Sequence, residues 1–81
     1  MVVIAYDIKD EKRLRKVAKF LEEMGIRAQR SVFEVDMGFV KAKKILKELQ
    51  KLMNEDEDKC FLYEIKNKED ILASTSIERI I

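Results

Sequence analysis

The chain has 81 residues, 47% hydrophobic and 41% charged, and its 17 basic and 16 acidic side chains leave a net charge of +1. This composition excludes a disordered linker and fits one folded domain, and the balanced charge gives no global sign of a nucleic-acid binder. Because the sequence contains no histidine, it excludes Ser-His-Asp or Cys-His catalysis and zinc sites built from Cys and His.

Residues 2–7 (VVIAYD) predict a strand covered on both faces, because apolar residues run through it without alternation. Asp7 ends this strand. A carboxylate at the mouth of a buried strand is unfavourable unless a metal ion, a cation of the same chain or a symmetry-related copy compensates its charge. From the sequence alone, a role for Asp7 in a turn or in an ion pair with a helix cation is favoured over a metal site.

A helix is predicted after this strand, with Asp10 as its N-cap and Gly25 as the residue that ends it. Residues at spacings of three and four give the helix one apolar stripe, formed by Leu14, Val17, Ala18, Leu21 and Met24. Basic side chains concentrate between Lys9 and Arg30, which allows a local anion-binding face. Cations in a first helical turn oppose the helix dipole, so phosphate contact and ordinary solvation are both open for them.

Residues 26–36 predict a second extended segment. No Gly, Asn or Pro lies inside RAQRSVFEV to make a tight hairpin, so one strand with a bulge is favoured over two strands. A second amphipathic helix is predicted to begin near Met37 or Gly38. The acidic run at 54–58 closes it and is interpreted as a solvated helix terminus. Residues 60–65 and about 75–81 predict two further strands.

The cysteine at position 60 is the single one in the sequence, which excludes an intrachain disulfide. It lies in the apolar run CFLY, where we expect it to serve as a small buried hydrophobe. The N-terminal apolar run is too short for a signal peptide and ends in an acid, and no stretch approaches membrane-spanning length. We therefore expect a soluble, cytoplasmic protein that does not bind a membrane.

This order of elements predicts an α+β fold of the ferredoxin-like type, a single domain over residues 1–81 with two helices on one face of a small antiparallel sheet. The other face of such a sheet is open, yet two of the predicted strands are apolar on both sides. We therefore expect a homodimer whose open sheet faces pack against each other.

Three motifs carry a resemblance to a known family: YDI at residues 6–8, DEKRLRKVAKFLEEMG at 10–25 and RAQRSVFE at 27–34. Together they resemble the small CRISPR-associated endonuclease of the spacer-acquisition machinery, the second protein of the core adaptation pair and partner of the CRISPR integrase. The resemblance spans nearly the whole chain, including the acidic turn before CFLYEI and the terminal SIERII.

The resemblance implies a ferredoxin-like homodimer whose terminal strand, about residues 75–81, pairs with the partner chain. It implies a divalent-metal site, for Mg²⁺ or Mn²⁺, where Asp7 meets its twin across the two-fold axis. The implied activity is metal-dependent cleavage of single-stranded RNA or double-stranded DNA, and the implied partner is the integrase, which the dimer bridges on DNA. The family fold also requires two strands between residues 27 and 36.

Site residues follow from the matched motif positions. The resemblance assigns Asp7 as the catalytic and metal-binding residue. It assigns nucleic-acid contacts to Arg13, Arg15, Lys16 and Arg27, with Tyr6, Ser31 and Phe33 in supporting roles. We expect Tyr6 and Phe33 to be core aromatics rather than platforms for bases. Ser31 has no histidine to activate it, so its expected role is a hydrogen bond near the metal or phosphate.

Other functions remain open at this stage. A non-catalytic structural adaptor of the integrase complex and a virulence-associated, toxin-type ribonuclease both fit the same fold. A plain RNA-binding module is disfavoured, because the glycine-aromatic signature of a base-stacking sheet is missing.

Overall fold

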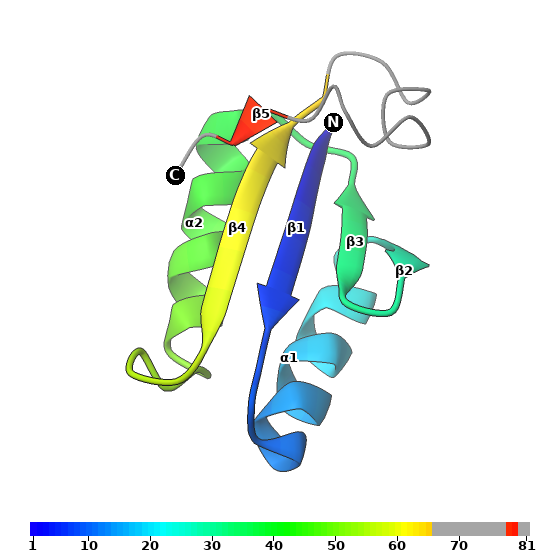
Figure 1. The fold of residues 1–81 in the computed structure, drawn as a ribbon. Helices are drawn as coiled ribbons and strands as arrows, with labels where there is room; N and C mark the ends of the chain where they lie inside the picture. The colour runs from blue at the N-terminus through cyan, green and yellow to red at the C-terminus, as the bar shows by residue number, and fades with distance from the viewer. Residues whose placement is uncertain (66–77, 80–81) are drawn as a thin grey trace.

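A computed structural model describes residues 1–65 and 78–79, which form one sheet with two helices on one of its faces (Figure 1). The helices are α1 (Glu11–Glu22) and α2 (Phe39–Gln50). The strands are β1 (Val2–Asp7), β2 (Ile26–Gln29), β3 (Val32–Val35), β4 (Lys59–Glu64) and β5 (Glu78–Arg79). They lie in the order β2-β3-β1-β4-β5, and each described pair of neighbours is antiparallel. The predicted α+β, ferredoxin-like fold is confirmed.

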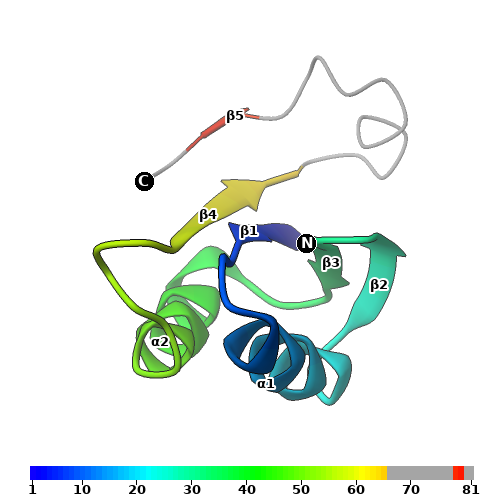
Figure 2. The same ribbon diagram turned by 60° about the horizontal axis from the view of Figure 1, so that its bottom comes forward.

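Both helices lie side by side on the same side of the sheet (Figure 2). Asp10 caps α1 as predicted, and its Oδ2 accepts a hydrogen bond from the Arg13 amide at 3.0 Å. α1 ends at Glu22, three residues before Gly25, whose amide still donates to the Leu21 carbonyl at 3.0 Å. Within the described ranges, no helix is long and apolar enough to cross a membrane.

Gly25 is needed for a close approach between the end of α1 and strand β3. A Cβ atom at this position would collide with the backbone oxygen of Glu34 and would press against the Val35 side chain. Glycine lacks that atom, so the chain passes directly from the helix into β2 alongside β3.

Residues 26–35 form two strands, so the prediction of a single strand over 26–36 was wrong. The two residues Arg30 and Ser31 turn the chain, and the register shifts between Arg27 and Gln29 as a bulge in β2. The turn lacks the usual glycine or asparagine. It is stabilised instead by the central strand: β3 pairs with β1, and the Ser31 carbonyl accepts a hydrogen bond from the Tyr6 amide at 3.1 Å.

The core lies between the sheet and the two helices. Side chains alternate along β1, so that Val2, Ile4 and Tyr6 point toward the helices and are buried. The other strands and the helices contribute the remaining buried residues, which are Ile8, Val17, Leu21, Phe33, Val35, Ala42, Leu46, Leu49 and Leu62.

The sheet face turned away from the helices is also apolar, as predicted. Val3 and Ile65 are buried there, with Met1, Val32 and Tyr63 packed around them. Since the structure holds one chain, the predicted sheet-to-sheet homodimer stays a prediction.

The predicted terminal strand over residues 75–81 lies partly outside the described residues. Its described part, β5, pairs with β4 of the same chain, with Arg79 opposite Tyr63 and Glu78 opposite Glu64. Pairing of this strand with a partner chain stays a prediction.

Candidate functional site

Asp7 is the last residue of β1, at the point where the strand leaves the sheet. Because side chains alternate, Tyr6 points toward the helices and Asp7 toward the open face. Asp7 pairs in register with Lys59 of β4, and its Oδ2 lies 3.3 Å from Nζ of Lys9. The Asp7 side chain is 59% exposed, and exposed ion pairs of this kind are weak. The carboxylate therefore remains accessible to a ligand.

One chain provides Asp7 as a single carboxylate for a metal. In the part of the chain that the structure describes, no three His, Cys, Asp or Glu side chains gather into a metal-binding group. Mg²⁺ typically binds one or two carboxylates and completes its coordination with water and phosphate oxygens. The donor chemistry of an exposed carboxylate therefore fits such an ion, and the metal itself and a second copy of Asp7 as its ligand stay predictions.

Next to this site, the buried carboxylate of Asp58 binds Arg13 of α1. Nε of Arg13 donates to Oδ2 of Asp58 at 2.9 Å and Nη2 to Oδ1 at 3.4 Å, while Nη2 also donates to Glu57 Oε2 at 2.8 Å. The amides of Lys9 and Asn54 donate to the same carboxylate at 3.0 and 2.8 Å. The Arg13 hydrogen bond is the main reason why the pKa of Asp58 is lowered to about 2, against the opposing effect of burial.

This cluster joins the β1–α1 connection to the α2–β4 connection. It fixes the Lys9 amide, two residues beyond Asp7. Asp58 was missed: interpreting the whole 54–58 run as a solvated helix terminus was wrong for this residue, whose side chain is fully buried. Its position in the sequence could have indicated this role. Asp58 directly precedes a predominantly apolar strand, just as Asp7 ends one.

The residues matched for nucleic-acid binding are not gathered in one place. Arg13 is engaged by the two carboxylates of Glu57 and Asp58. Arg15 and Lys16 are exposed on α1 and form no ion pair with the other residues that the structure describes. The contribution of all three to nucleic-acid binding stays a prediction.

Arg27 stands in a different group, beside the two core aromatics. Its guanidinium lies over the Phe33 ring, 5.2 Å from the centroid, and pairs with Glu22 at 3.0 Å. The Phe33 ring in turn stacks on Tyr6, with centroids 6.2 Å apart. Because Tyr6 and Asp7 point to opposite faces of the sheet, this group lies across the sheet from Asp7. Ser31 is half-buried in the turn beside it.

The Tyr6 hydroxyl is buried and has no hydrogen-bond partner among the residues described. Burial raises the pKa of this phenol, an effect that the nearby Arg27 opposes and Glu22 reinforces. The hydroxyl therefore stays protonated at neutral pH. Tyr6 and Phe33 are core aromatics, as predicted.

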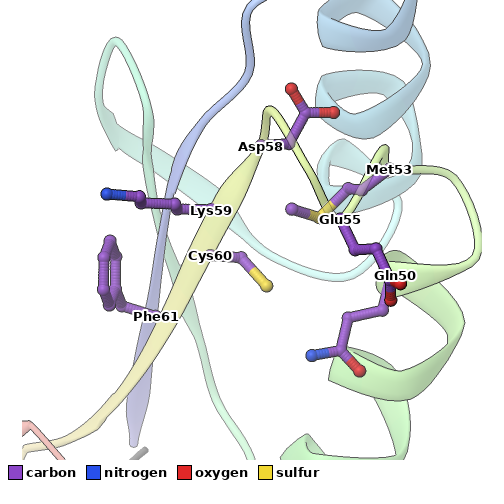
Figure 3. Close-up of a pocket in the computed structure, with 7 residues that line it drawn as sticks. All are labelled: Gln50, Met53, Glu55, Asp58, Lys59, Cys60 and Phe61. Atoms are coloured by element: carbon purple, nitrogen blue, oxygen red, sulfur yellow. The ribbon is translucent and has the colours of Figure 1, made fainter.

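A hollow of about 580 Å³ lies between the end of α2 and the start of β4 (Figure 3). Cys60 points to one side of β4 and Lys59 and Phe61 to the other, as strand alternation requires. Burial raises the pKa of the Cys60 thiol, so the nucleophilic thiolate is disfavoured at neutral pH. Its packing against the core agrees with the expected hydrophobic role.

Comparison with known proteins gives the family. The family model described as CRISPR associated protein Cas2 matches residues 1–71. The chain is 41% identical over 63 residues to the CRISPR-associated endoribonuclease Cas2 3 of Synechocystis sp., which covers 78% of this chain and 68% of that protein. It is 35% identical over an alignment of 85 positions to the CRISPR-associated endonuclease Cas2 of Halalkalibacterium halodurans, covering 99% and 84%.

Solved structures agree with the sequence matches. The crystal structure of Streptococcus pyogenes Cas2 at pH 6.5 superposes with a TM-score of 0.72 at 31% identity, covering 89% of this chain and 92% of that one. A hypothetical protein from Thermus thermophilus gives a TM-score of 0.74 at 29% identity, covering 82% and 80%. Sequence and fold lead to the same conclusion: this chain belongs to the Cas2 family of CRISPR-associated proteins.

Proposed function

We propose that this chain is a CRISPR-associated nuclease that cleaves phosphodiester bonds of RNA or DNA with a divalent metal, Mg²⁺ or Mn²⁺, held by Asp7. The relatives from Synechocystis and H. halodurans are named endoribonuclease and endonuclease, which supports this class of activity. The observation that carries the proposal is the exposed Asp7 carboxylate at the end of the central strand. The family match sets aside the toxin-type ribonuclease.

The homodimer belongs to this proposal, because Asp7 and the apolar cluster around Val3 occupy the same sheet face. Packing two such faces together would cover the partly exposed members of the cluster, Met1, Val32 and Tyr63, and bring two Asp7 side chains toward each other. Two facing carboxylates repel unless a cation lies between them. When bound, the metal supplies Lewis-acid chemistry that polarises a phosphate and an attacking water. Asp7 would hold the ion, and Lys9, whose Nζ lies 3.3 Å from the Asp7 carboxylate, would add a positive charge to the site.

The test is cleavage of matched single-stranded RNA and double-stranded DNA with Mg²⁺, Mn²⁺ or EDTA. Wild type is compared with Asp7→Asn and with Asp36→Asn, an exposed acid outside the site. We expect metal-dependent cutting by wild type and Asp36→Asn, and a loss of about 100-fold or more in Asp7→Asn. Cutting that survives in Asp7→Asn, or that persists in EDTA, would overturn the assignment of Asp7.

We also propose an adaptor role, in which the dimer bridges the CRISPR integrase on DNA. Exposed apolar side chains at the β2 edge favour a protein contact there: Ile26 is 72% exposed and Met24 38%. Both line a hollow of about 580 Å³. Capture of a CRISPR integrase should be kept by Asp7→Asn and lost by Ile26→Asp. Capture that Ile26→Asp leaves unchanged would contradict a contact at this edge.

A further inference from the structure

The pair formed by Arg13 and Asp58 uses both oxygens of the buried carboxylate. Oδ1 of Asp58 accepts from the Lys9 amide and from Nη2 of Arg13, and Oδ2 accepts from the Asn54 amide and from Nε of Arg13. The Asp58 side chain is completely buried, and that of Arg13 is 26% exposed. Lys9 precedes α1, whereas Asn54 lies in the connection between α2 and β4. One carboxylate therefore holds together two connections that are far apart in the sequence.

These two connections flank Asp7. Asp7 pairs with Lys59 at the end of the β1–β4 ladder, and Asp58 directly precedes Lys59 (Figure 3). The Lys9 amide lies two residues past Asp7 and donates to Asp58 at 3.0 Å. The backbone is thus held before Asp7 by the ladder and after it by the Asp58 carboxylate. Because the Asp7 side chain is 59% exposed, little packing fixes it, and its direction depends on the backbone on either side.

Asp58 also explains why a cation stands at position 13. A positive charge in the first turn of a helix opposes the helix dipole, and here a buried carboxylate compensates it. The planar fork of an arginine suits two-point binding of a carboxylate, and Glu57 accepts a further hydrogen bond from Nη2 at 2.8 Å. Removing one partner of such a pair leaves the other charge without compensation in a buried place, which is unfavourable. Each member therefore fixes the other.

We propose that Arg13 and Asp58 act as one positioning pair for Asp7, and that Arg13 serves the reaction through this pair rather than by contact with a nucleic-acid phosphate. Arg13 holds the Asp58 carboxylate, and the carboxylate holds the Lys9 amide. The inference rests on the proposed function, in which Asp7 is the metal ligand. Groups that orient a metal ligand typically change metal affinity or activity by about 10- to 100-fold when they are replaced.

The variants that test the pair are made in the full chain: Arg13→Gln, Asp58→Asn, both together, and Asp7→Asn. Asparagine keeps the shape of Asp58 but offers one acceptor oxygen in place of two, so it cannot accept from the Lys9 and Asn54 amides at once. Val35→Ala is the control for lost stability, because it opens the core at the end of β1 that is far from Asp7. All measurements use a temperature at which circular dichroism shows every variant folded.

The first measurement is Mn²⁺ binding without nucleic acid, followed by electron paramagnetic resonance. We expect Arg13→Gln and Asp58→Asn each to weaken binding by about 10-fold or more. The double variant should bind as the weaker single variant does, because residues that act as a unit are not additive, and Val35→Ala should stay near wild type. Wild-type affinity in the single variants would overturn the proposal, as would losses that multiply in the double variant or an equal loss in Val35→Ala.

Asp7→Asn separates this inference from the proposed function. We expect it to lose Mn²⁺ binding. If wild type binds no Mn²⁺, or if Asp7→Asn binds it as wild type does, the proposed function fails and this inference fails with it. If Asp7→Asn loses binding while the variants of Arg13 and Asp58 keep it, the proposed function stands and the positioning pair is wrong.

The second measurement distinguishes positioning from phosphate contact. One phosphate contact contributes about 0.9 to the slope of log K against log salt on duplex DNA and about 0.7 on a single strand. In EDTA, we expect Arg13→Gln to keep the wild-type slope on duplex DNA and on single-stranded RNA. In the cleavage assay it should lower kcat by about 10-fold or more and leave KM near wild type. A slope reduced by one contact, or a loss confined to KM, would show that Arg13 binds the backbone itself and would refute the positioning role.

Discussion

The buried carboxylate of Asp58 accepts four hydrogen bonds. Arg13 donates two of them, and the amides of Lys9 and Asn54 donate one each. Its pKa, about 2 in the folded chain, lies below the ordinary value of about 3.9 for an unfolded aspartate. A group with a depressed folded pKa stabilises the fold above its unfolded pKa, and that contribution is lost as pH falls through the folded pKa. The window for this loss therefore extends from about pH 5 down to about pH 2.

We predict that Asp58→Asn lowers the free energy of unfolding at neutral pH by about 2 kcal/mol, since hydrogen bonds to a charged acceptor are replaced by weaker ones. It should also flatten the acid side of the stability profile. Urea denaturation at stepped pH measures both effects, with the exposed Asp56→Asn as the control. A wild-type acid profile in Asp58→Asn would show that another carboxylate dominates.

The hydroxyl of Tyr6 has no hydrogen-bond partner among the described residues, so removing it should raise the free energy of unfolding. Burying a polar group without a partner is unfavourable, and phenylalanine keeps the ring that stacks on Phe33. We expect Tyr6→Phe to stabilise the chain by about 1 kcal/mol in urea denaturation. Tyr63→Phe, on the half-buried open face, is the control. Destabilisation by Tyr6→Phe would mean that the hydroxyl binds a water molecule or a ligand in solution.

The role of a residue could be predicted from the sequence where it depends on neighbours that are close in the sequence. Asp10 was identified as the cap of α1 from its place before an apolar stripe, and Asp7 was singled out because it ends an apolar strand. The role of Asp58 could not be predicted in this way. Its main partner, Arg13, is 45 positions away in the sequence, and only the folded chain brings the two side chains together.

Among the elements, the apolar stripes predicted both helices and the apolar runs predicted strands β1 and β4, because both patterns are local properties of the sequence. The hairpin of β2 and β3 was missed for the opposite reason. Its turn at Arg30 and Ser31 has no residue suited to a tight hairpin, and pairing with β1 stabilises it. The family resemblance required two strands here, and the structure has them.

Two glycines of similar sequence context should respond differently to substitution. At Gly25 a Cβ meets the backbone oxygen of Glu34, which cannot move without disturbing β3, so Gly25→Ala should destabilise by about 1–3 kcal/mol. At Gly38 an added Cβ would meet no atom of the described residues within 4 Å. Gly38→Asp adds a capping carboxylate to α2 and should raise the free energy of unfolding by about 0.5 kcal/mol. Thermal unfolding compares the pair. Equal effects of the two substitutions would contradict the close approach at Gly25.

For the whole molecule, a net charge of +1 conceals how the charges are arranged. The sequence drew attention to basic residues between Lys9 and Arg30, yet four exposed lysines form a stripe along α2 outside that segment: Lys43, Lys44, Lys47 and the C-cap residue Lys51. Placing the charges of residues 39–51 on a helical wheel would have found the stripe. Which side of the sheet it occupies, relative to Asp7, required the folded chain.

The open sheet face leads to a prediction about assembly. If the apolar cluster around Val3 and Ile65 packs against a second copy, light scattering should give twice the chain mass of 9.6 kDa. Tyr63→Lys places a charge in this cluster and should raise the dimer dissociation constant about 10-fold or more. Val40→Lys, on the helical side, should leave the dimer unchanged. A wild-type monomer would contradict the sheet-to-sheet homodimer and, with it, a metal shared by two Asp7 residues.

The bulge in β2 bears on how this protein behaves at high concentration. Strand β2 forms one edge of the sheet, and such edges invite strands of other chains to add and to grow into fibrils. Here the edge is four residues long, carries the charge of Arg27 and loses its regular spacing before Gln29. An incoming strand therefore finds too short a regular run to pair with. We therefore expect the protein not to aggregate at high concentration. Deleting Ala28 would remove the bulge and straighten the edge, and should make the protein prone to aggregation.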